Sequence, residues 1–453
     1  MFNKILIANR GEIALRVIRA CKELGVRTVA VYSKADEKSM HVQLADDAIC
    51  IGPGPSSQSY LMIDRIIAAA EVANVDAIHP GYGFLSENAR FARICESCKI
   101  KFIGPSADTI EIMGDKNRAR ATAKKWKVPI TPGTDGCLKD DKEALAAAAV
   151  MGYPVMLKAA NGGGGRGMRP VHNEAAMGAA FSSARLEAEK CFGNGDMYME
   201  KLILNPHHIE IQVLGDTKGN VIALGERDCS LQRRNQKIIE ECPSPFISEK
   251  LRKRMCEASV RLCKEIKYVN AGTIEYLVDE HENFYFMEMN TRIQVEHPVT
   301  EEVYGVDLIK EQIRIADGQP LSDHVRKAER RAHSIECRIN AEDPYNNFAP
   351  SPGRIGNYYA PGGRGVRVDS HIYAGYEVPS FYDSMIAKLI VTGNTRDIAI
   401  ARMKRALLEF KIEGIKTTIP FQHAILDNSD FKSGNYNIGW VEQFLQKQPR
   451  GGL

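Results

Sequence analysis

Apolar runs alternate with amphipathic segments over the first quarter of the chain. KILIAN at residues 4–9 and RTVAVYS at 27–33 are continuous apolar runs typical of buried strands. Between them, GEIALRVIRACKELG spaces its apolar residues as one face of a helix and ends at Gly25, a residue that favours a helix end. Further strands are predicted in DAIHPGYG and IKFIGPS. Strands that alternate with helices predict an α/β fold with a parallel, doubly wound sheet over residues 1–113.

The pattern changes after the Pro- and Gly-rich stretch VPITPGTDG, which marks a boundary near residues 128–136. A small module over about 131–203 follows, with a helix, the strand YPVMLKAA, a glycine loop, and the strands MRPV and MYMEKLI. From residue 204 the chain is richer in strands, such as HIEIQVLGD, VIALGERD, GTIEYLVD and FYFMEMN. These segments predict a second, larger sheet.

Composition narrows the class of protein. The 453 residues predict about two to four domains, and 44% hydrophobic with 26% charged residues is typical of an ordinary enzyme. The net charge of +3, with no run of Lys or Arg, argues against a nucleic-acid partner. No run of 18 apolar residues occurs, so no membrane span is expected. Eleven scattered cysteines fit a reducing environment, and we expect a cytoplasmic location.

The segment KAANGGGGRGMRP contains a formal GxGxxG at residues 162–167. A dinucleotide site needs a helix after this pattern, and Pro170 would break that helix. A Walker loop needs Gly-Lys-Ser/Thr, whereas Gly167 precedes a methionine. A strand–loop–strand hairpin remains, whose bare amides, flanked by Lys158 and Arg166, can close over a phosphate. A plain surface loop is the alternative.

GTIEYLVDEHENFYFMEMN predicts a hairpin that carries two carboxylates. If Val278 lies opposite Phe284, Glu275 lies opposite Met287; a shift by one residue places Glu275 opposite Glu288. In the second register, a hard divalent cation would relieve the repulsion between the carboxylates, with Asn290 on the same face. Mg²⁺ or Mn²⁺ suits such oxygen ligands, and the alternative is a solvent-exposed polar face.

The segment EMNTRIQVEH places a polar side chain at every second position from Glu288 to Glu296. In an extended chain, side chains two apart share a face, so the row would line one side of a strand and its exit. Arg292 could then stabilise an anion and Glu296 could act as a general base near it. The alternative is a solvated strand end.

Several motifs occur along the whole chain in one order: NRGEIALRVIRA, HPGYGFLSEN, GGGGRGM, ERDCSLQRR, EMNTRIQVEHPVTE, ECRINAEDP and YDSMIAKL. The series resembles the ATP-grasp biotin carboxylases. The resemblance implies an N-terminal Rossmann-like biotin carboxylase domain at 1–113, an ATP-grasp region at 114–318 with a mobile glycine-loop lid at 131–203, and a C-terminal biotin carboxylase domain at 319–446.

The resemblance also assigns roles to residues of this chain. Residues implied to contact ATP are Lys116, Lys158, Gly164, Gly165, Glu200, Lys201, Leu202, Ile203, His208, Gln232, Asn235, Glu275 and Glu288. Residues implied for the metal are Glu275, Glu288 and Asn290, those for bicarbonate are Lys237, Arg292, Gln294 and Val295, and those for biotin are Arg338 and Tyr82. The implied catalytic residues are Arg292, Glu296, Lys237 and Arg338. Asn235 departs from the family, in which many members have a histidine there.

The activity implied is a ligase reaction. Bicarbonate, deprotonated by Glu296, attacks the γ-phosphorus of ATP to give carboxyphosphate, whose CO₂ is transferred to biotin. The chain contains no Met-Lys-Met sequence for biotin attachment, so we expect biotin on a separate biotin carboxyl carrier protein. Carboxyltransferase subunits would then use the carboxyl group. A homodimer is also implied, with Arg19, Glu23 and Arg367 matching its interface and Arg364 replacing a usual phenylalanine.

The acceptor that the complete carboxylase serves is a separate question. Acetyl-CoA carboxylase, which feeds malonyl-CoA and fatty acid synthesis, is the default expectation, and a propionyl-CoA or pyruvate carboxylase subunit is the alternative. Two further alternatives are another ATP-grasp carbon–nitrogen ligase, such as half of a carbamoyl-phosphate synthetase, and a catalytically silent nucleotide-binding scaffold. The presence of Glu275, Glu288 and Glu296 argues against a silent scaffold.

Overall fold

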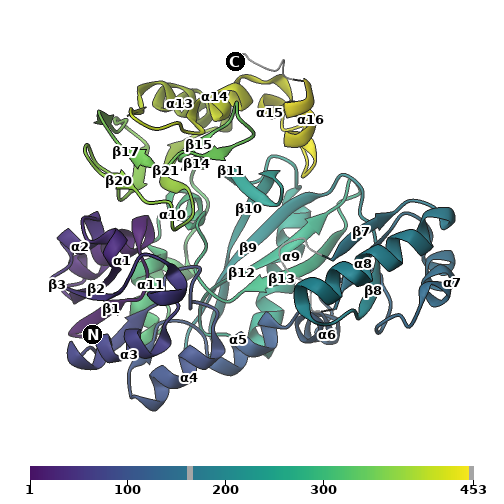
Figure 1. Ribbon diagram of the computed structural model, residues 1–453, viewed down its shortest axis with the longest axis horizontal. Coiled ribbons are helices and arrows are strands. Elements are labelled where there is room, and N and C mark those ends of the chain that lie inside the picture. Colours follow the sequence, from purple (N-terminus) through teal and green to yellow (C-terminus); the bar gives the residue numbers. More distant parts are fainter. Residues whose placement is uncertain (161–166, 448–453) are drawn as a thin grey trace.

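The structure is a computed structural model that describes residues 1–160 and 167–447 (Figure 1). The first part of the chain forms a five-stranded parallel sheet in the order β3-β2-β1-β4-β5. The parallel sheet was predicted for this region, but strand β3 was not. Its elements are β1 (Lys4–Ile7), α1 (Gly11–Glu23), β2 (Arg27–Ser33), α2 (Met40–Leu44), β3 (Asp47–Gly52), α3 (Ile63–Val72), β4 (Ala77–His79), α4 (Ala89–Ser97), β5 (Lys101–Phe102) and α5 (Ala107–Gly114).

Side chains of β1 alternate between the two faces of this sheet. Ile5 and Ile7 pack in the same apolar cluster as Ile13 of α1, whereas Leu6 packs with Ile66 of α3 and with α4. The sheet is therefore covered on both faces, which explains why its strands read as continuous apolar runs. Helix α1 ends as predicted, because Gly25 adopts a left-handed φ of +73° just after it.

The small module has an antiparallel sheet in the order β7-β6-β8. Its elements, with the helix that precedes it, are α6 (Lys116–Lys125), α7 (Asp141–Met151), β6 (Val155–Ala159), β7 (Met168–Val171), α8 (Met177–Phe192) and β8 (Met197–Lys201). The predicted strand–loop–strand hairpin is confirmed, because β6 pairs directly with β7. Gly164 and Gly165 lie outside the described residues. The module has its own apolar core, which Leu157 and Phe181 share.

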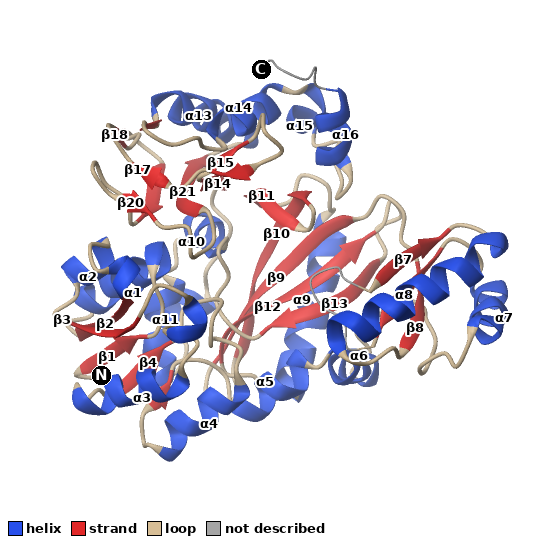
Figure 2. Ribbon diagram, in the orientation of Figure 1, coloured by secondary structure: helices blue, strands red, loops and turns tan. Residues whose placement is uncertain are grey.

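The larger sheet has eight strands, in the order β13-β12-β9-β10-β11-β14-β21-β19, and every pairing in it is antiparallel (Figure 2). The strands are β9 (His207–Gly215), β10 (Val221–Arg233), β11 (Gln236–Cys242), β12 (Asn270–Val278), β13 (Phe284–Asn290), β14 (His333–Asn340), β19 (Val366–Ser370) and β21 (Met385–Gly393). Strands β14, β19 and β21 belong to the region predicted as the C-terminal domain. One continuous sheet therefore joins this region to the ATP-grasp region.

Helices cover both faces of this sheet. Helix α9 (Glu249–Glu265) packs on the face that carries Ile209, Ile211 and Val213. Helices α10 (His297–Tyr304) and α11 (Leu308–Ala316) pack with Leu214 on the opposite face. The remaining helices of the described chain are α12 (Asp323–Arg326), α13 (Arg396–Glu409), α14 (Ile419–Asp427), α15 (Ser429–Ser433) and α16 (Trp440–Lys447).

Short two-stranded ribbons complete the C-terminal region. They are formed by β15 (Glu342–Asp343) with β16 (Ala349–Pro350), β17 (Gly353–Arg354) with β20 (Glu377–Val378), and β18 (Tyr358–Tyr359) with β22 (Lys411–Ile412). Within the described ranges, none of the helices is long and apolar enough to span a membrane.

Glu241 of β11 ties the C-terminal helices to the sheet. Its carboxylate accepts hydrogen bonds from Nε2 of His333 at 2.7 Å and from Nε of Arg396 at 2.8 Å, and it also bonds the Tyr436 hydroxyl. Burial alone would raise the pKa of Glu241, but His333 and Arg396 outweigh burial and lower this pKa to about 2. The carboxylate is therefore ionised at neutral pH.

We predict that this ion cluster makes the stability of the protein acid-sensitive. A carboxyl with a depressed pKa stabilises the folded state above its unfolded pKa, and this stability is lost as the pH falls toward the folded value. Glu241→Gln should lower the free energy of unfolding at pH 7 by roughly 3 kcal/mol, and should flatten its fall between about pH 4.5 and 2. Thermal unfolding at several pH values measures both effects. The control is Glu409→Gln, which removes a half-buried carboxylate that forms an ion pair with Arg405. Equal effects of the two changes would contradict the prediction.

Candidate active site

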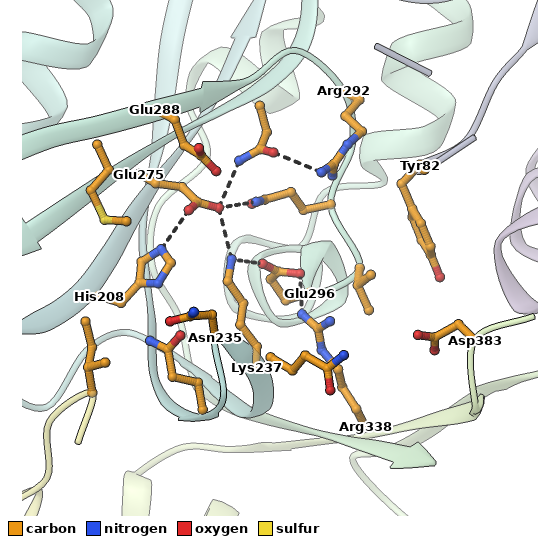
Figure 3. Close-up of a pocket in the computed structure, with 18 of the residues that line it drawn as sticks. Tyr82, His208, Asn235, Lys237, Glu275, Glu288, Arg292, Glu296, Arg338 and Asp383 are labelled. Atoms are coloured by element: carbon orange, nitrogen blue, oxygen red, sulfur yellow. Dashed lines mark hydrogen bonds and ion pairs between the residues drawn. The ribbon is translucent and has the colours of Figure 1, made fainter. Parts of the chain in front are cut away.

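A cavity of about 1090 Å³ lies where the N-terminal domain, the small module and the large sheet meet (Figure 3). The structure brings together every predicted site residue that it describes. Those that line the cavity are Tyr82, Lys116, Lys158, Glu200, Lys201, Leu202, Ile203, His208, Gln232, Asn235, Lys237, Glu275, Glu288, Asn290, Arg292, Gln294, Val295, Glu296 and Arg338. These residues come from widely separated parts of the chain, so the cavity depends on the complete fold.

The hairpin of β12 and β13 combines the two registers that the sequence allows. Val278 lies opposite Phe284, yet Glu275 lies opposite Glu288, because a β-bulge between them leaves Met287 unpaired and 41% exposed. One extra residue reverses the alternation of side chains. The bulge therefore places Glu288 and Asn290 on the cavity face, whereas an unbroken ladder would have turned them toward the core beneath α9.

Glu275 has several polar partners in the cavity. It accepts hydrogen bonds from Nδ2 of Asn290 at 2.8 Å and from Nε2 of Gln294 at 2.7 Å, and Nε2 of His208 lies 2.9 Å from it. Burial would raise the pKa of Glu275, but Lys237 and His208 hold it well below its usual range. Burial and the charge of Glu275 raise the pKa of Glu288. The charge of one carboxylate therefore disfavours ionisation of the other, as expected for the register that places them opposite each other.

Lys237 lies among three buried carboxylates. Its Nζ is 2.5 Å from Glu296 and 3.1 Å from Glu275 (Figure 3), and it is 2.6 Å from Glu210. His208, Glu210 and Glu275 also bring ligand atoms within 4.8 Å of one another, a spacing that a metal ion could use. Because the Lys237 ammonium bonds two members of that group, it already serves as their cation, and the opposed pair Glu275 and Glu288 fits a further cation better.

Arg227 is a second buried cation that bonds this cluster, and it was not predicted from the sequence. Its side chain is fully buried, and its five N–H groups bond Glu210 at 2.6 Å, Gln212 and Gln294 at 2.8 Å, Thr300 at 3.0 Å and Thr273 at 3.1 Å. The guanidinium thereby fixes Gln294 beside Glu275. The ERDCSLQRR motif contains Arg227, but its partners on other strands cannot be read from the sequence.

The polar row does not continue along a strand as predicted, and that part of the interpretation is wrong. Strand β13 ends at Asn290, the chain bends, and Glu296 occupies the N-cap position of α10, where its side chain makes no capping hydrogen bond. The side chains still converge, because the bend carries Gln294 back to Glu275 and Glu296 to Lys237. A carboxylate at the first turn of a helix is favoured by the helix dipole.

Glu87, from the N-terminal domain, was also missed. It accepts hydrogen bonds from the backbone N–H of Thr291 at 2.9 Å and from Nε of Arg292 at 2.9 Å. Arg292 also donates from Nη2 to Asn290 at 2.9 Å. Contacts between the two domains therefore set the direction of the Arg292 guanidinium. Glu87 lies in the HPGYGFLSEN motif, but no local pattern pairs it with a residue 205 positions away.

Glu296 joins the two ends of the cavity. It bonds Lys237 on one side and Nη2 of Arg338, at 2.8 Å, on the other (Figure 3). Burial would raise the pKa of Glu296, but Lys237, Arg338 and Arg227 hold it well below its usual range. Glu296 is therefore ionised at neutral pH, and its basicity rises whenever another anion draws these cations away.

Tyr82 and Arg338 lie at the end of the cavity away from His208 (Figure 3). The Tyr82 hydroxyl donates to Glu12 at the start of α1, and Arg338 also donates from Nε to Glu240 of β11.

At the opposite end of the cavity, Lys158 forms an ion pair with Glu200. Asn235 adopts a φ of +64° in the turn between β10 and β11, a conformation that Asn tolerates better than most residues.

Three family profiles together match nearly the whole chain. They are described as "Biotin carboxylase, N-terminal domain" for residues 1–110, "Carbamoyl-phosphate synthase L chain, ATP binding domain" for 115–324, and "Biotin carboxylase C-terminal domain" for 336–443. Together with the two large sheets, the small module and the cavity where they meet, these matches define an ATP-grasp enzyme.

Relatives match this chain over nearly their full length. A biotin carboxylase from Nostoc is 56% identical over 98% of this chain and 99% of its own, and a pyruvate carboxylase subunit from Methanothermobacter thermautotrophicus is 54% identical over 98% and 90%. A Campylobacter jejuni biotin carboxylase structure, described as a beta-gamma-ATP complex, has a TM-score of 0.94 and 52% identity over 98% of this chain and 99% of its own. The chain belongs to the biotin carboxylase family, and it is an ATP-dependent biotin carboxylase.

A solved relative adds information about ligands. It is the biotin carboxylase domain dimer of a Hydrogenobacter thermophilus 2-oxoglutarate carboxylase, in complex with MgADP, ADP and bicarbonate. Its TM-score to this chain is 0.93, with 52% identity over 98% of each chain. The same fold therefore occurs in carboxylases with different acceptors.

We predict that Arg227 is required for the stability of the site. Arg227→Met should lower the free energy of unfolding by about 3–5 kcal/mol, because it leaves the Glu210 carboxylate buried with one cation fewer. Denaturant unfolding at neutral pH measures the loss, and the exposed Arg254, changed to Met, is the control. A loss no larger than that of the control would show that the buried guanidinium is dispensable.

Proposed function

We propose that this biotin carboxylase carboxylates biotin on a separate biotin carboxyl carrier protein, as the first half-reaction of an acetyl-CoA carboxylase that feeds malonyl-CoA and fatty acid synthesis. One observation carries the assignment of the site. Glu296 bonds both Lys237 and Arg338, and so links the carboxylate cluster to the end of the cavity that holds Tyr82. A bicarbonate bound beside Glu296 would lie between ATP and biotin.

Glu275, Glu288 and Asn290 would hold Mg²⁺ or Mn²⁺. Their fit rests on the direct opposition of the two carboxylates, on the raised pKa of Glu288, and on donor atoms that are all oxygens. When bound, the metal neutralises charge on the nucleotide phosphates. Asn290 donates its amide N–H to Glu275, which leaves its carbonyl oxygen directed away from that carboxylate and toward Arg292.

ATP would lie between the small module and the large sheet. Lys116 and Lys158 would contact its phosphates, together with the loop that contains Gly164 and Gly165. Glu200, Lys201, Leu202 and Ile203 would meet the adenine edge, and His208, Gln232 and Asn235 would lie along the nucleotide. All of the described members of this set line one cavity, which supports the placement.

Bicarbonate would bind among Lys237, Arg292, Gln294 and Val295. The ion pair of Arg292 with Glu87 supports this role, because it holds the guanidinium in one orientation before the anion arrives. As bicarbonate shares Lys237, the hold of that cation on Glu296 weakens and the carboxylate becomes a better base. Glu296 would then accept the bicarbonate proton while the bicarbonate oxygen attacks the γ-phosphorus and ADP leaves.

Carboxyphosphate so formed would separate into CO₂ and phosphate close to biotin. The phosphate can take the proton from the ureido N1 of biotin, and that nitrogen then attacks CO₂. Arg338 would stabilise the negative charge on the ureido oxygen, since its guanidinium is fixed by Glu240 and Glu296. Tyr82 would contact the biotin ring.

The acceptor of the carboxyl group is proposed on the relatives that are named simply biotin carboxylase. A second candidate is a pyruvate carboxylase, favoured by the 54% identity to the Methanothermobacter protein, and a propionyl-CoA carboxylase is a further alternative. Purified carriers from each system, offered to this chain in parallel, would distinguish them by their rates of carboxylation. A homodimer and transferase subunits complete the proposed assembly.

Glu288→Gln tests the metal site. The change keeps the shape of the side chain but removes the charge opposite Glu275, so bicarbonate-dependent ATP cleavage should be abolished and binding of Mn²⁺ with nucleotide should weaken. Electron paramagnetic resonance of Mn²⁺ measures the binding. Glu280→Gln, an exposed carboxylate in the same hairpin, is the matched control. Wild-type activity of Glu288→Gln at saturating Mg²⁺ would refute the assignment.

Glu296→Ala tests the base. Turnover should fall by roughly 10² or more, the range for loss of a general base, and the KM for ATP should change little. Steady-state kinetics with ATP and bicarbonate varied separately provide both values. A normal turnover combined with a raised KM for ATP would instead place Glu296 in nucleotide binding.

Reconstitution tests the partner. The purified chain, with Mg·ATP, bicarbonate and a biotinylated carrier domain, should form carboxybiotin on the carrier much faster than on free biotin. The same carrier domain without biotin is the control. Covalent biotin on this chain in an avidin blot, or a carrier no better than free biotin, would contradict a separate carrier.

A further inference from the structure

Two buried glutamates lie opposite each other in the large sheet, and one of them bonds Arg338. Glu240 of β11 pairs with Glu336 of β14 in the antiparallel ladder, and both residues are 0% exposed. Like charges directly opposite in a sheet repel, and the cost rises when both are removed from water. Two ionised carboxylates at this position would be expensive for the fold.

The hydrogen bonds of the pair are unequal. Glu240 accepts a hydrogen bond from Nε of Arg338 at Oε1. Within the part of the chain that the structure describes, its Oε2 and both oxygens of Glu336 are buried without a hydrogen-bond partner from the protein. These three buried acceptor atoms, on two residues that lie opposite each other in the ladder, therefore have no protein donor unless one of the carboxyl groups carries a proton.

The cations around Glu336 are bonded elsewhere. Lys388 of β21 is fully buried nearby, but its Nζ bonds the backbone oxygen of Val295 at 2.8 Å and lies 3.1 Å from Glu12. Arg338, on the same strand as Glu336, bonds Glu240 and Glu296. Tyr82, which also faces this group, donates to Glu12.

We propose that Glu336 carries a proton at neutral pH and donates it to Oε2 of Glu240, so that the two carboxyls share one proton and one negative charge. Glu336 is then a positioning residue that acts through Glu240. Its hydrogen bond holds the Glu240 carboxylate in the orientation in which Oε1 accepts from Arg338. The Arg338 guanidinium is thereby held between Glu240 and Glu296.

Burial raises the pKa of Glu336 well above its usual value, and the charge of Glu240 adds to this effect while Lys388 opposes it. Burial also raises the pKa of Glu240 to about 7, against the lowering influence of Arg338. Since Arg338 stabilises the charge on Glu240 directly, the proton belongs on Glu336. The part of this inference that concerns catalysis rests on the proposed role of Arg338 toward biotin.

Infrared spectroscopy tests the proton without any substrate. The wild-type protein at pH 7 should show the carbonyl stretching band of a buried protonated carboxylic acid, and Glu336→Gln should remove it, whereas Glu280→Gln should not. A wild-type spectrum from which Glu336→Gln removes no such band would overturn the proposal. This readout is independent of the proposed function, because it persists even if the chain does not carboxylate a carrier.

Activity tests the positioning role. The amide of Glu336→Gln can still donate to Glu240, so carrier carboxylation should stay close to the wild-type rate. Glu336→Met removes the donor and should lower carrier carboxylation roughly tenfold, the effect of losing one hydrogen bond to a charged group, with a smaller effect on bicarbonate-dependent ATP cleavage. Equal losses in the two variants, or a wild-type rate in Glu336→Met, would overturn the proposal. If Glu336→Met does not fold, the infrared result and the rate of Glu336→Gln decide.

Discussion

Three buried carboxylates gathered around one ammonium group determine how the large sheet must assemble. Glu210, Glu275 and Glu296 are almost completely buried, and each lies within bonding distance of the single ammonium of Lys237. A buried charge without a partner is costly, so strands β9, β11 and β12 and the start of α10 must all be in place before the cluster is stable. The cluster that supports the chemistry therefore also depends on correct assembly of the large sheet.

The same constraint explains how distant parts of the chain are coupled. Because the sheet continues from β13 to β19, the hairpin that carries Glu275 and Glu288 and the strand that carries Arg338 belong to one sheet. Glu296 connects the charges of these two regions, and Lys388 holds the peptide of Val295 from β21. A shift of either half of the sheet would therefore disturb both the Lys237 cluster and the end of the cavity that holds Arg338.

Much of this was predictable from the sequence, and the failures have physical reasons. Strand and helix periodicity predicted the parallel sheet, and Pro170 together with the glycines predicted the lid hairpin. The bulge at Met287 was not predictable, because two registers were equally compatible with the turn. Glu87 and Arg227 were missed because their roles depend on partners brought together only by tertiary structure. The polar residues from Glu288 to Glu296 do line one cavity, but their predicted extended conformation was wrong, because a bend and a helix follow strand β13.

In the proposed reaction, this charge cluster directs an oxygen of bicarbonate at the γ-phosphorus of ATP. If it does, that oxygen remains on phosphorus when carboxyphosphate separates into CO₂ and phosphate. Turnover of ¹⁸O-labelled bicarbonate in unlabelled water, with the biotinylated carrier present, should therefore yield inorganic phosphate that contains ¹⁸O, as measured by mass spectrometry. Phosphate that contains oxygen from water and none from bicarbonate would contradict the account.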